Sequence, residues 1–331
     1  MTSLTHRQRL ETTLAGNHPD RPPVALWRHF PVDDQRADTL AAATVAFQRT
    51  YDFDFVKITP ASSFCLRGWG AQDQWRGSTE GTREYTHRVI QTPEDWYTLK
   101  PQSPNQGALA TQLEAIHLIR SALPADTPII QTIFSPLAQA KNLAGGERLL
   151  AHIRQAPDAV RAGLQTITES ITRFIEAALP LGLDGVFYAV QHAQAHLLSL
   201  DEFQVFGRVF DLQALQPARA LWLNVLHLHG SNVFFDALTD YPVAILNWHD
   251  LETPPSLKDA RTRFAGAVCG GLRQWDSLAL GTVEQVQREA EAALTATDGT
   301  RFVLGTGCVT PIIAPHGNLM AARRAVETWH G

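Results

Sequence analysis

The sequence predicts an α/β protein of the (β/α)8, or TIM, barrel class, because short β-like runs alternate with longer helix-like stretches. The β-like runs are rich in β-branched and aromatic residues and have glycine, proline or aspartate at their borders. An open, doubly wound sheet is the alternative, but no G-x-G-x-x-G motif follows the first run. We expect eight strands, at 23–27, 54–58, 128–134, 184–190, 221–229, 243–248, 264–272 and 301–308.

The stretches between these runs carry helical periodicity. Residues 159–179 place Leu164, Ile167, Ile171 and Ile175 every three or four positions, which is typical of a helix with one buried face. Further helices are expected over 282–296 and, after the last strand, over 317–329, and the N-terminal "TSLTHRQRLETTLAG" predicts a helix that flanks the bottom of the barrel. The stretch 61–103 is long for one β–α connection, and loops of that length are usually functional lids or rims. We therefore expect residues 1–331 to form a single barrel domain with an N-terminal extension and a long loop after the second strand.

Composition and charge exclude several classes of protein. The net charge of -5, without a basic cluster, argues against a nucleic-acid partner. No apolar run reaches the roughly 20 residues that cross a bilayer, and the N-terminal stretch lacks the apolar core of a signal peptide. Three cysteines in 331 residues make no disulfide framework and indicate a reducing compartment. We therefore expect a cytoplasmic enzyme without a membrane partner.

Candidate metal ligands end two of the predicted strands. His227 and His229 are two positions apart, so both side chains point into the barrel near the carboxyl end, where barrel active sites lie. Cys308 ends the eighth run as His229 ends the fifth. Two imidazoles and a thiolate suit Zn²⁺ and leave its fourth position open for substrate. The alternative is that the histidines are hydrogen-bonded core residues and the cysteine a small hydrophobe.

Five further polar residues at strand ends are candidate catalytic residues. Arg28 could grip a carboxylate or phosphate, or close the barrel in a salt bridge. Lys57 is interpreted as an anion anchor or ion-pair partner more readily than as a Schiff-base lysine. Gln191 and His192 follow the fourth strand and His249 follows the sixth, as polar rim residues or as partners of a metal-bound imidazole.

Four stretches of the chain match a known pattern. They are "PVALWR" at 23–28, "VLHLHG" at 225–230, "GGL…LALGTVEQV" at 270–286 and "LGTGCVTPIIAPHGNLMAARRAV" at 304–326, the last with the form Gly-Cys-x-x-Pro. Through them the chain resembles the uroporphyrinogen decarboxylase superfamily over nearly its whole length, and in particular the methylcobamide-dependent methyltransferase branch.

The resemblance also argues against porphyrinogen decarboxylation. The decarboxylases use two arginines after the first strand, an aspartate after the second, and a tyrosine, a serine and a histidine further on. Here Arg28 fits the first arginine, but Val32, Ala140, Ala193 and Thr306 stand at four of the other positions, and the stretch "KITPASS" at the end of the second strand holds no aspartate. Five of the six positions are lost.

The methyltransferase branch holds zinc with a His-x-Cys pair on the fifth strand and a cysteine after the eighth. The resemblance therefore assigns the zinc ligands to His227, Cys308 and His229, the last in place of the middle cysteine. Replacing a thiolate by neutral imidazole removes one negative charge, so a zinc-bound thiol would be more strongly deprotonated but less nucleophilic. The acceptor is therefore left open between a thiol, a water and an alkoxide.

What the resemblance implies is a zinc-dependent methyltransferase. A methyl group would pass from methylcobalamin or another methylated corrinoid to a zinc-activated small-molecule acceptor, oriented by Arg28, Gln191 and His249. A partner protein would carry the corrinoid, because the chain lacks the D-x-H-x-x-G stretch of the corrinoid-carrying fold. Homodimers are common in the superfamily. Two alternatives remain: a metal-free decarboxylase-like enzyme acting on a carboxylated tetrapyrrole or a smaller acid, and a non-catalytic barrel that binds a tetrapyrrole or corrinoid.

Overall fold

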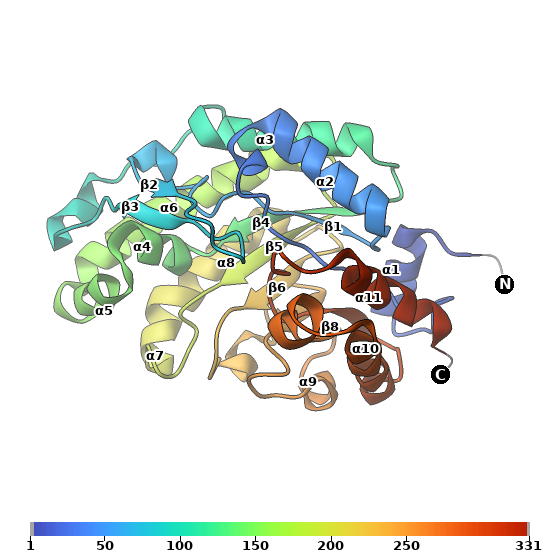
Figure 1. Cartoon of the computed structure of the whole chain (residues 1–331). Helices are drawn as coiled ribbons and strands as arrows, with labels where there is room; N and C mark the ends of the chain where they lie inside the picture. Colours follow the sequence, from blue (N-terminus) through green and yellow to red (C-terminus); the bar gives the residue numbers. More distant parts are fainter. Residues whose placement is uncertain (1–2, 330–331) are drawn as a thin grey trace.

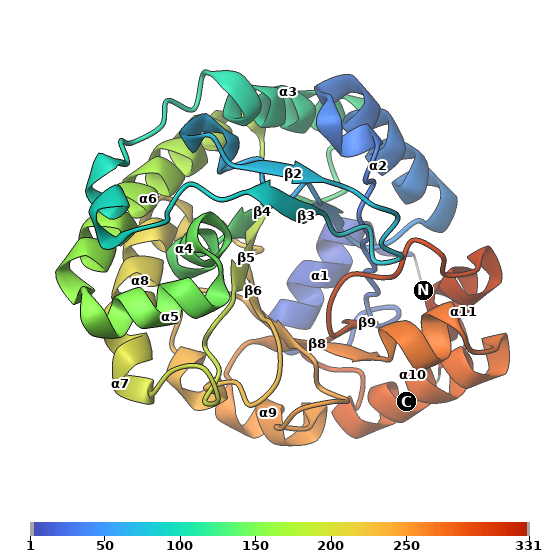
Figure 2. The same ribbon diagram turned by 60° about the vertical axis from the view of Figure 1, so that its left-hand side comes forward.

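A curled, parallel β-sheet with helices around its outside forms the centre of the protein (Figures 1 and 2). The computed structural model describes residues 3–329. Each of the last seven predicted runs contains a strand, and neighbouring strands pair in parallel in the order β1-β4-β5-β6-β7-β8-β9. The strands are β1 (Val56–Ile58), β4 (Ile129–Phe134), β5 (Gly185–Val190), β6 (Val225–Leu228), β7 (Ile245–Trp248), β8 (Ala267–Leu272) and β9 (Phe302–Thr306).

The first predicted run, 23–27, lies between the two edges of this sheet. Val24 bridges to Leu304 in β9, and the Ala25 amide donates to the Leu304 carbonyl at 2.9 Å. On the other side the Asp54 amide donates to the Val24 carbonyl at 2.9 Å, just before β1. The prolines before Val24 carry no N–H for a ladder, so the run is reduced from the expected strand to one bridge residue. The architecture is a barrel-like α/β fold built on seven strands.

Helices connect the strands on the outside of the sheet. The predicted helices at 159–179, 282–296 and 317–329 are present as α6, α10 and α11. The predicted apolar stripe of α6 is buried, and α10 begins with a capping box between Thr282 and Gln285. The helices are α1 (His6–Leu14), α2 (Ala37–Tyr51), α3 (Gly107–Ala122), α4 (Pro136–Ala144), α5 (Gly146–Gln155), α6 (Pro157–Ala178), α7 (Leu200–Phe203), α8 (Val209–Leu215), α9 (Leu257–Arg263), α10 (Val283–Thr297) and α11 (His316–Thr328).

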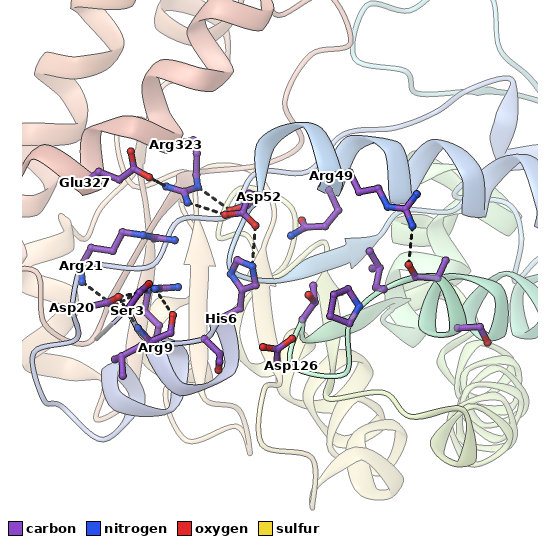
Figure 3. Close-up of a pocket in the computed structure, with 18 residues that line it drawn as sticks. Ser3, His6, Arg9, Asp20, Arg21, Arg49, Asp52, Asp126, Arg323 and Glu327 are labelled. Carbon is purple, nitrogen blue, oxygen red and sulfur yellow. Dashed lines mark hydrogen bonds and ion pairs between the residues drawn. The ribbon is translucent and has the colours of Figure 1, made fainter. Parts of the chain in front are cut away.

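Helix α1 covers the end of the sheet where the strands begin. Its Leu10 has no exposed surface and packs into the same apolar cluster as Phe55 and Val225. Beside it, Asp54 has no exposed surface and accepts hydrogen bonds from Arg9 at 2.8 Å and from Arg21 at 2.7 Å. A cavity of about 1070 Å³ opens next to these groups, and its charged side chains bond mainly to one another (Figure 3).

The long stretch after β1 contains an antiparallel ribbon, β2 (Gln72–Gln74) and β3 (Glu84–His87). The ribbon crosses the opposite, carboxyl end of the sheet (Figure 2). We call residues 72–87 the strap. The strap is tied to the far side of the opening, where the Thr79 carbonyl accepts from the Ile312 amide at 2.8 Å and the Glu80 carboxylate accepts from Trp275 at 3.1 Å. Within residues 3–329, no helix has the length and apolar character needed to cross a membrane.

Candidate metal centre

Four potential metal ligands meet at the carboxyl ends of three strands. His227 lies on β6, His229 and His249 follow β6 and β7, and Cys308 follows β9. One ligand atom from each lies within 4.8 Å of the other three. In a tetrahedral zinc site with the usual bond lengths, ligand atoms are roughly 3.3–3.8 Å apart. The structure therefore brings the three sequence-predicted ligands together, and a contraction of about 1 Å would give metal-binding distances.

His249 joins this group for a reason that can be read from the strands. In the parallel register, His227 lies opposite Asn247, so His229 and His249 follow at the next inward positions of the two neighbouring strands. Leu228 and Trp248, between them, point outward into the core under the helices and have no exposed surface. From the sequence we expect His249 to be a polar rim residue or a partner of a metal-bound imidazole. The alternation in "NWH" carries the same signal as the one in "HLH" and indicates a further candidate ligand.

Asn247 determines which nitrogen of His227 is free to bind a metal. Its Nδ2 donates to the carbonyls of Cys269 at 2.9 Å and Thr306 at 2.8 Å, so its Oδ1 faces the other way, toward His227 Nδ1 at 2.7 Å. Because Oδ1 can only accept, His227 must carry its proton on Nδ1. The lone pair of Nε2 is then available, and the ring is held in one orientation.

Burial keeps His227 and His229 in the neutral form that binds metals. It lowers the pKa of His227 well below its ordinary value and that of His229 to about 4, with further lowering from neighbouring positive charges. Both rings are therefore neutral near pH 7, as metal binding requires. Burial also raises the pKa of the Cys308 thiol to about 11, and a bound cation would reverse that preference.

One atom of the cluster lacks a partner that a metal would supply. His249 Nε2 is buried and makes no hydrogen bond within the part of the chain that the structure describes, while its Nδ1 lies 3.3 Å from the Glu252 carboxylate. Buried polar atoms are almost always paired, so an orphaned ring nitrogen beside two other imidazoles and a thiol points to an absent partner. The donor set of three imidazoles and one sulfur fits Zn²⁺.

A cavity of about 530 Å³ opens above the cluster, between the strand ends and the strap. Its volume is that of a site for a small molecule. His227, His229 and Cys308 form part of its lining, and so do Lys57 and Gln191, two of the predicted catalytic residues. The structure thus gathers five of the eight sequence-predicted site residues around one cavity, and His249 belongs to the adjoining cluster. Their roles remain predictions.

Lys57 is held in a fixed position at the wall of this cavity. Its Nζ lies 3.1 Å from the Thr59 hydroxyl and 4.5 Å from the centre of the Phe187 ring, which itself stacks on His227. Burial lowers the pKa of Lys57 to about 7. The amine therefore lies beside the candidate metal ligands without a carboxylate partner in the described range.

The structure does not bring Arg28 and His192 into the cavity. Trp27 faces the cavity, so the next side chain turns to the other side, where the Arg28 guanidinium lies 5.2 Å from the ring centre of Phe30 and 5.3 Å from that of Phe47. His192 is buried with a positive φ of 68°, and its Nδ1 has no hydrogen-bond partner among residues 3–329. Neither residue belongs to the described lining of the cavity.

A curled parallel sheet with its cavity and convergent polar groups at the carboxyl ends of the strands is the arrangement of a barrel enzyme. The chain belongs to the uroporphyrinogen decarboxylase family, since the model named Uroporphyrinogen decarboxylase (URO-D) matches residues 5–329. The family predicted from the sequence motifs is thereby confirmed.

Two relatives found by sequence comparison are named as methyltransferases. The chain is 23% identical over 341 residues to Methylcobamide:CoM methyltransferase MtbA of Methanosarcina acetivorans, covering 96% of each protein. It is 25% identical over 228 residues to Methylcobamide:CoM methyltransferase MtaA of Methanosarcina barkeri, covering 66% of this chain and 63% of that protein. These relatives place the chain among the methyltransferase enzymes of its family, as the sequence predicted.

Solved structures share the fold. A methyltransferase from Methanosarcina mazei superposes with a TM-score of 0.83 at 20% identity, over 98% of this chain and 99% of that one. A B12-independent methionine synthase from Shewanella sp. W3-18-1 gives a TM-score of 0.60 at 14% identity, over 92% of each chain. At these identities the likeness concerns the fold alone.

Proposed function

We propose that this protein is a zinc-dependent methyltransferase that moves a methyl group from a methylated corrinoid, carried by a partner protein, to a small-molecule acceptor. The single observation that carries the proposal is the convergence of three histidines and Cys308 beneath a cavity of small-molecule size. The two relatives named as methylcobamide methyltransferases support the corrinoid donor. Three imidazoles and a thiolate support zinc over magnesium or calcium, which prefer oxygen ligands.

Bound zinc would act as a Lewis acid that favours the deprotonated form of the acceptor. His227, His229, His249 and Cys308 would hold it, with His227 oriented by Asn247. If all four residues held the metal, the acceptor atom would take a further position at the metal or replace one of them.

The remaining residues act on the reacting molecules. In the transfer, the acceptor loses a proton and forms the new bond to the methyl carbon, while the electron pair of the broken carbon–cobalt bond stays on cobalt. Trp27 and Phe187 give this part of the cavity an apolar wall that excludes water from the reacting atoms. Lys57 and Gln191 supply polar groups on the same wall that would orient the acceptor.

Metal content of the purified protein tests the proposal. We expect about one zinc per chain in the natural protein and below about 0.2 in Cys308→Ser, because removing one ligand weakens binding steeply. Cys65→Ser is the matched control, since Cys65 is a buried free cysteine outside the cluster. Absence of zinc from the natural protein even after zinc addition, or full zinc in Cys308→Ser, would overturn the assignment.

A further inference from the structure

Hydrogen bonds fasten the tip of the strap to the far side of the cavity opening. The Thr79 carbonyl accepts from the Ile312 amide at 2.8 Å. The Glu80 carboxylate accepts from Trp275 Nε1 at 3.1 Å and from Gln274 Nε2 at 3.4 Å. The donors lie on the segments that follow β9 and β8, whereas the strap follows β1. The closed strap therefore joins loops from opposite parts of the sheet (Figure 2).

The strap itself contributes little to the hydrophobic core. Among residues 72–87 only Gly81 is buried, and Tyr85, on β3, is the only member whose ring packs against the core. A segment held by hydrogen bonds can exchange them for bonds to water at small net cost, whereas a segment held by buried apolar surface cannot. The strap therefore belongs to the parts of the fold that can open without global unfolding.

The ribbon is bonded within itself as well as to the rim. At the tip, the Ser78 carbonyl accepts from the Gly81 amide at 2.9 Å and from Trp75 Nε1 at 3.1 Å. Strands β2 and β3 are paired, and Asp73 forms an ion pair with Arg83 across the ribbon at 3.1 Å. Because these contacts lie inside the strap, they persist when the contacts at the rim break. The strap can therefore move as one body.

The two limbs of the strap differ at its base. After β3, Arg88 Nη1 donates to the carbonyl of Asn142 at 2.6 Å and to that of Lys141 at 3.4 Å, and Ile90 has no exposed surface. Before β2, Gly70 has a φ of 101°, and no other heavy atom of the described residues lies within 4 Å of the place that a Cβ would take. One limb is thus anchored, and the other passes through a glycine with open space around it.

The closed position is a specific fit to the rim. A Cβ on Gly81 would lie 2.5 Å from His29 Cβ and 3.1 Å from Ile312 Cγ2, so glycine allows the tip to approach both residues closely. Beside it, Arg83 Nη1 donates to the Pro31 carbonyl at 2.7 Å.

We propose that the strap is a hinged lid, whose tip swings away from the segments after β8 and β9 to admit the methyl donor while β2 and β3 stay paired. Five strap residues line the cavity of about 530 Å³, which is therefore the cavity of the closed lid: Glu80, Thr82, Arg83, Glu84 and Tyr85. A small acceptor fits this volume, whereas a corrinoid carried by a protein is larger and has to approach from outside. The identity of the donor rests on the proposed function, and the lid rests on the contacts of the strap.

Amide hydrogen exchange, resolved to single residues by NMR on the purified protein, tests the lid. The Ile312 amide reports whether the tip is fastened, and the Gly81 amide, bonded inside the tip, reports whether the ribbon stays folded. Trp275→Phe keeps an aromatic ring but removes the donor to Glu80. We expect Ile312 exchange to accelerate about tenfold, because one charge-assisted hydrogen bond no longer opposes opening, and Gly81 exchange to stay unchanged. Glu80→Ala should act in the same way.

Glu84→Gln is the matched control, because Glu84 is an exposed carboxylate whose partner, Arg76 at 3.5 Å, lies in the strap as well. Its Ile312 exchange should equal that of the natural protein. Unchanged Ile312 exchange in both Trp275→Phe and Glu80→Ala would overturn the lid. Equal acceleration at Ile312 and Gly81 would also overturn it, because the tip would then unravel rather than swing.

Labelling of Cys308 in the metal-free protein provides a second measurement. Cys308 lines the cavity, while the two other cysteines are buried. We expect fluorescein maleimide, relative to the much smaller N-ethylmaleimide, to react faster in Trp275→Phe and Glu80→Ala than in the natural protein. The ratio of the two rates cancels any change in the reactivity of the thiol, and an unchanged ratio would contradict the lid. Neither measurement involves zinc or methyl transfer, so the lid and the proposed function can fail separately.

Discussion

Both ends of the sheet carry many charged and polar side chains, but the two ends differ in how completely these side chains are paired. At the amino-terminal end, most carboxylates and cations of the larger cavity are paired, among them Arg9 with Asp20 and Arg323 with Asp52 (Figure 3). No side chain lining that cavity has a buried polar atom without a partner, within residues 3–329. At the carboxyl end, His249 Nε2 and Gln191 Oε1 are buried and have no hydrogen-bond partner in the described range. Cavity volume alone would indicate the amino-terminal end, since the cavity there is about twice as large as the one at the carboxyl end. Unpaired groups, rather than volume, mark the place where a ligand is expected.

Breaking the paired end should give the largest effect, and on stability alone. In Asp54→Asn, Arg9 and Arg21 lose a buried counter-ion, and we expect the free energy of unfolding to fall by about 3–5 kcal/mol. Chemical denaturation measures this change. Asp126→Asn, on the same cavity but without an ion pair, should stay within about 0.5 kcal/mol of the natural protein. Loss of zinc per folded Asp54→Asn protein would contradict the separation of the two ends.

Two buried asparagines sharpen the comparison further. Asn247 makes three hydrogen bonds at the candidate metal centre, while Asn224 makes three at the start of β6, with Val186, Ala218 and Leu221. Asn247→Ala should weaken zinc binding about 10–100-fold, because His227 loses the acceptor that fixes its tautomer. Asn224→Ala should lower stability but leave zinc affinity unchanged. A zinc titration with a competing chelator measures both, and equal affinities in the two variants would remove Asn247 from the site.

The smallest expected effect concerns pH at the paired end. Burial lowers the pKa of His6, but hydrogen bonds to Asp52 and Asp54 outweigh it and raise that pKa from 6.5 to about 9. A raised pKa in the folded state contributes stability that is complete below pH 6.5 and is lost as the pH rises through about 9. The loss should be on the order of 1 kcal/mol, since Asp52 is largely exposed and screened.

Unfolding free energies measured from pH 6.5 to about 9 check this effect. In His6→Gln the fall in the free energy of unfolding over that pH interval should largely disappear. The prediction fails if the natural protein and His6→Gln lose the same stability over the interval.

Strand positions were predictable because buried parallel strands appear as apolar runs, and seven of the eight expected runs contain one. The strap was expected only as a loop, because β2 and β3 are polar and largely exposed, so hydrophobic alternation gives no signal. Alternation did place His227 and His229 on one face. Applied to Trp27 and Arg28, the same rule would have turned the arginine away from the cavity.

The contacts that complete the candidate site could not be predicted from the sequence. Asn247 carries no motif, and its role follows only from the carbonyls of Cys269 and Thr306, which come from two other strands. Likewise, Arg88 and Lys141 lie 53 positions apart, and they meet only because the chain that follows β3 packs against the end of α4. Such pairings depend on tertiary geometry rather than on local pattern.

The bridge between Val24 and Leu304 also constrains the order in which the protein can form. It joins residues 280 positions apart, so the ring of backbone contacts cannot be completed until almost the whole chain has left the ribosome. Until then β1 and β8 present unpaired edges, which are sites for association with other chains. The ring of strands therefore closes only late in synthesis, when β9 becomes available to pair with Val24. Nascent chains that stop before β9 are the ones most exposed to aggregation.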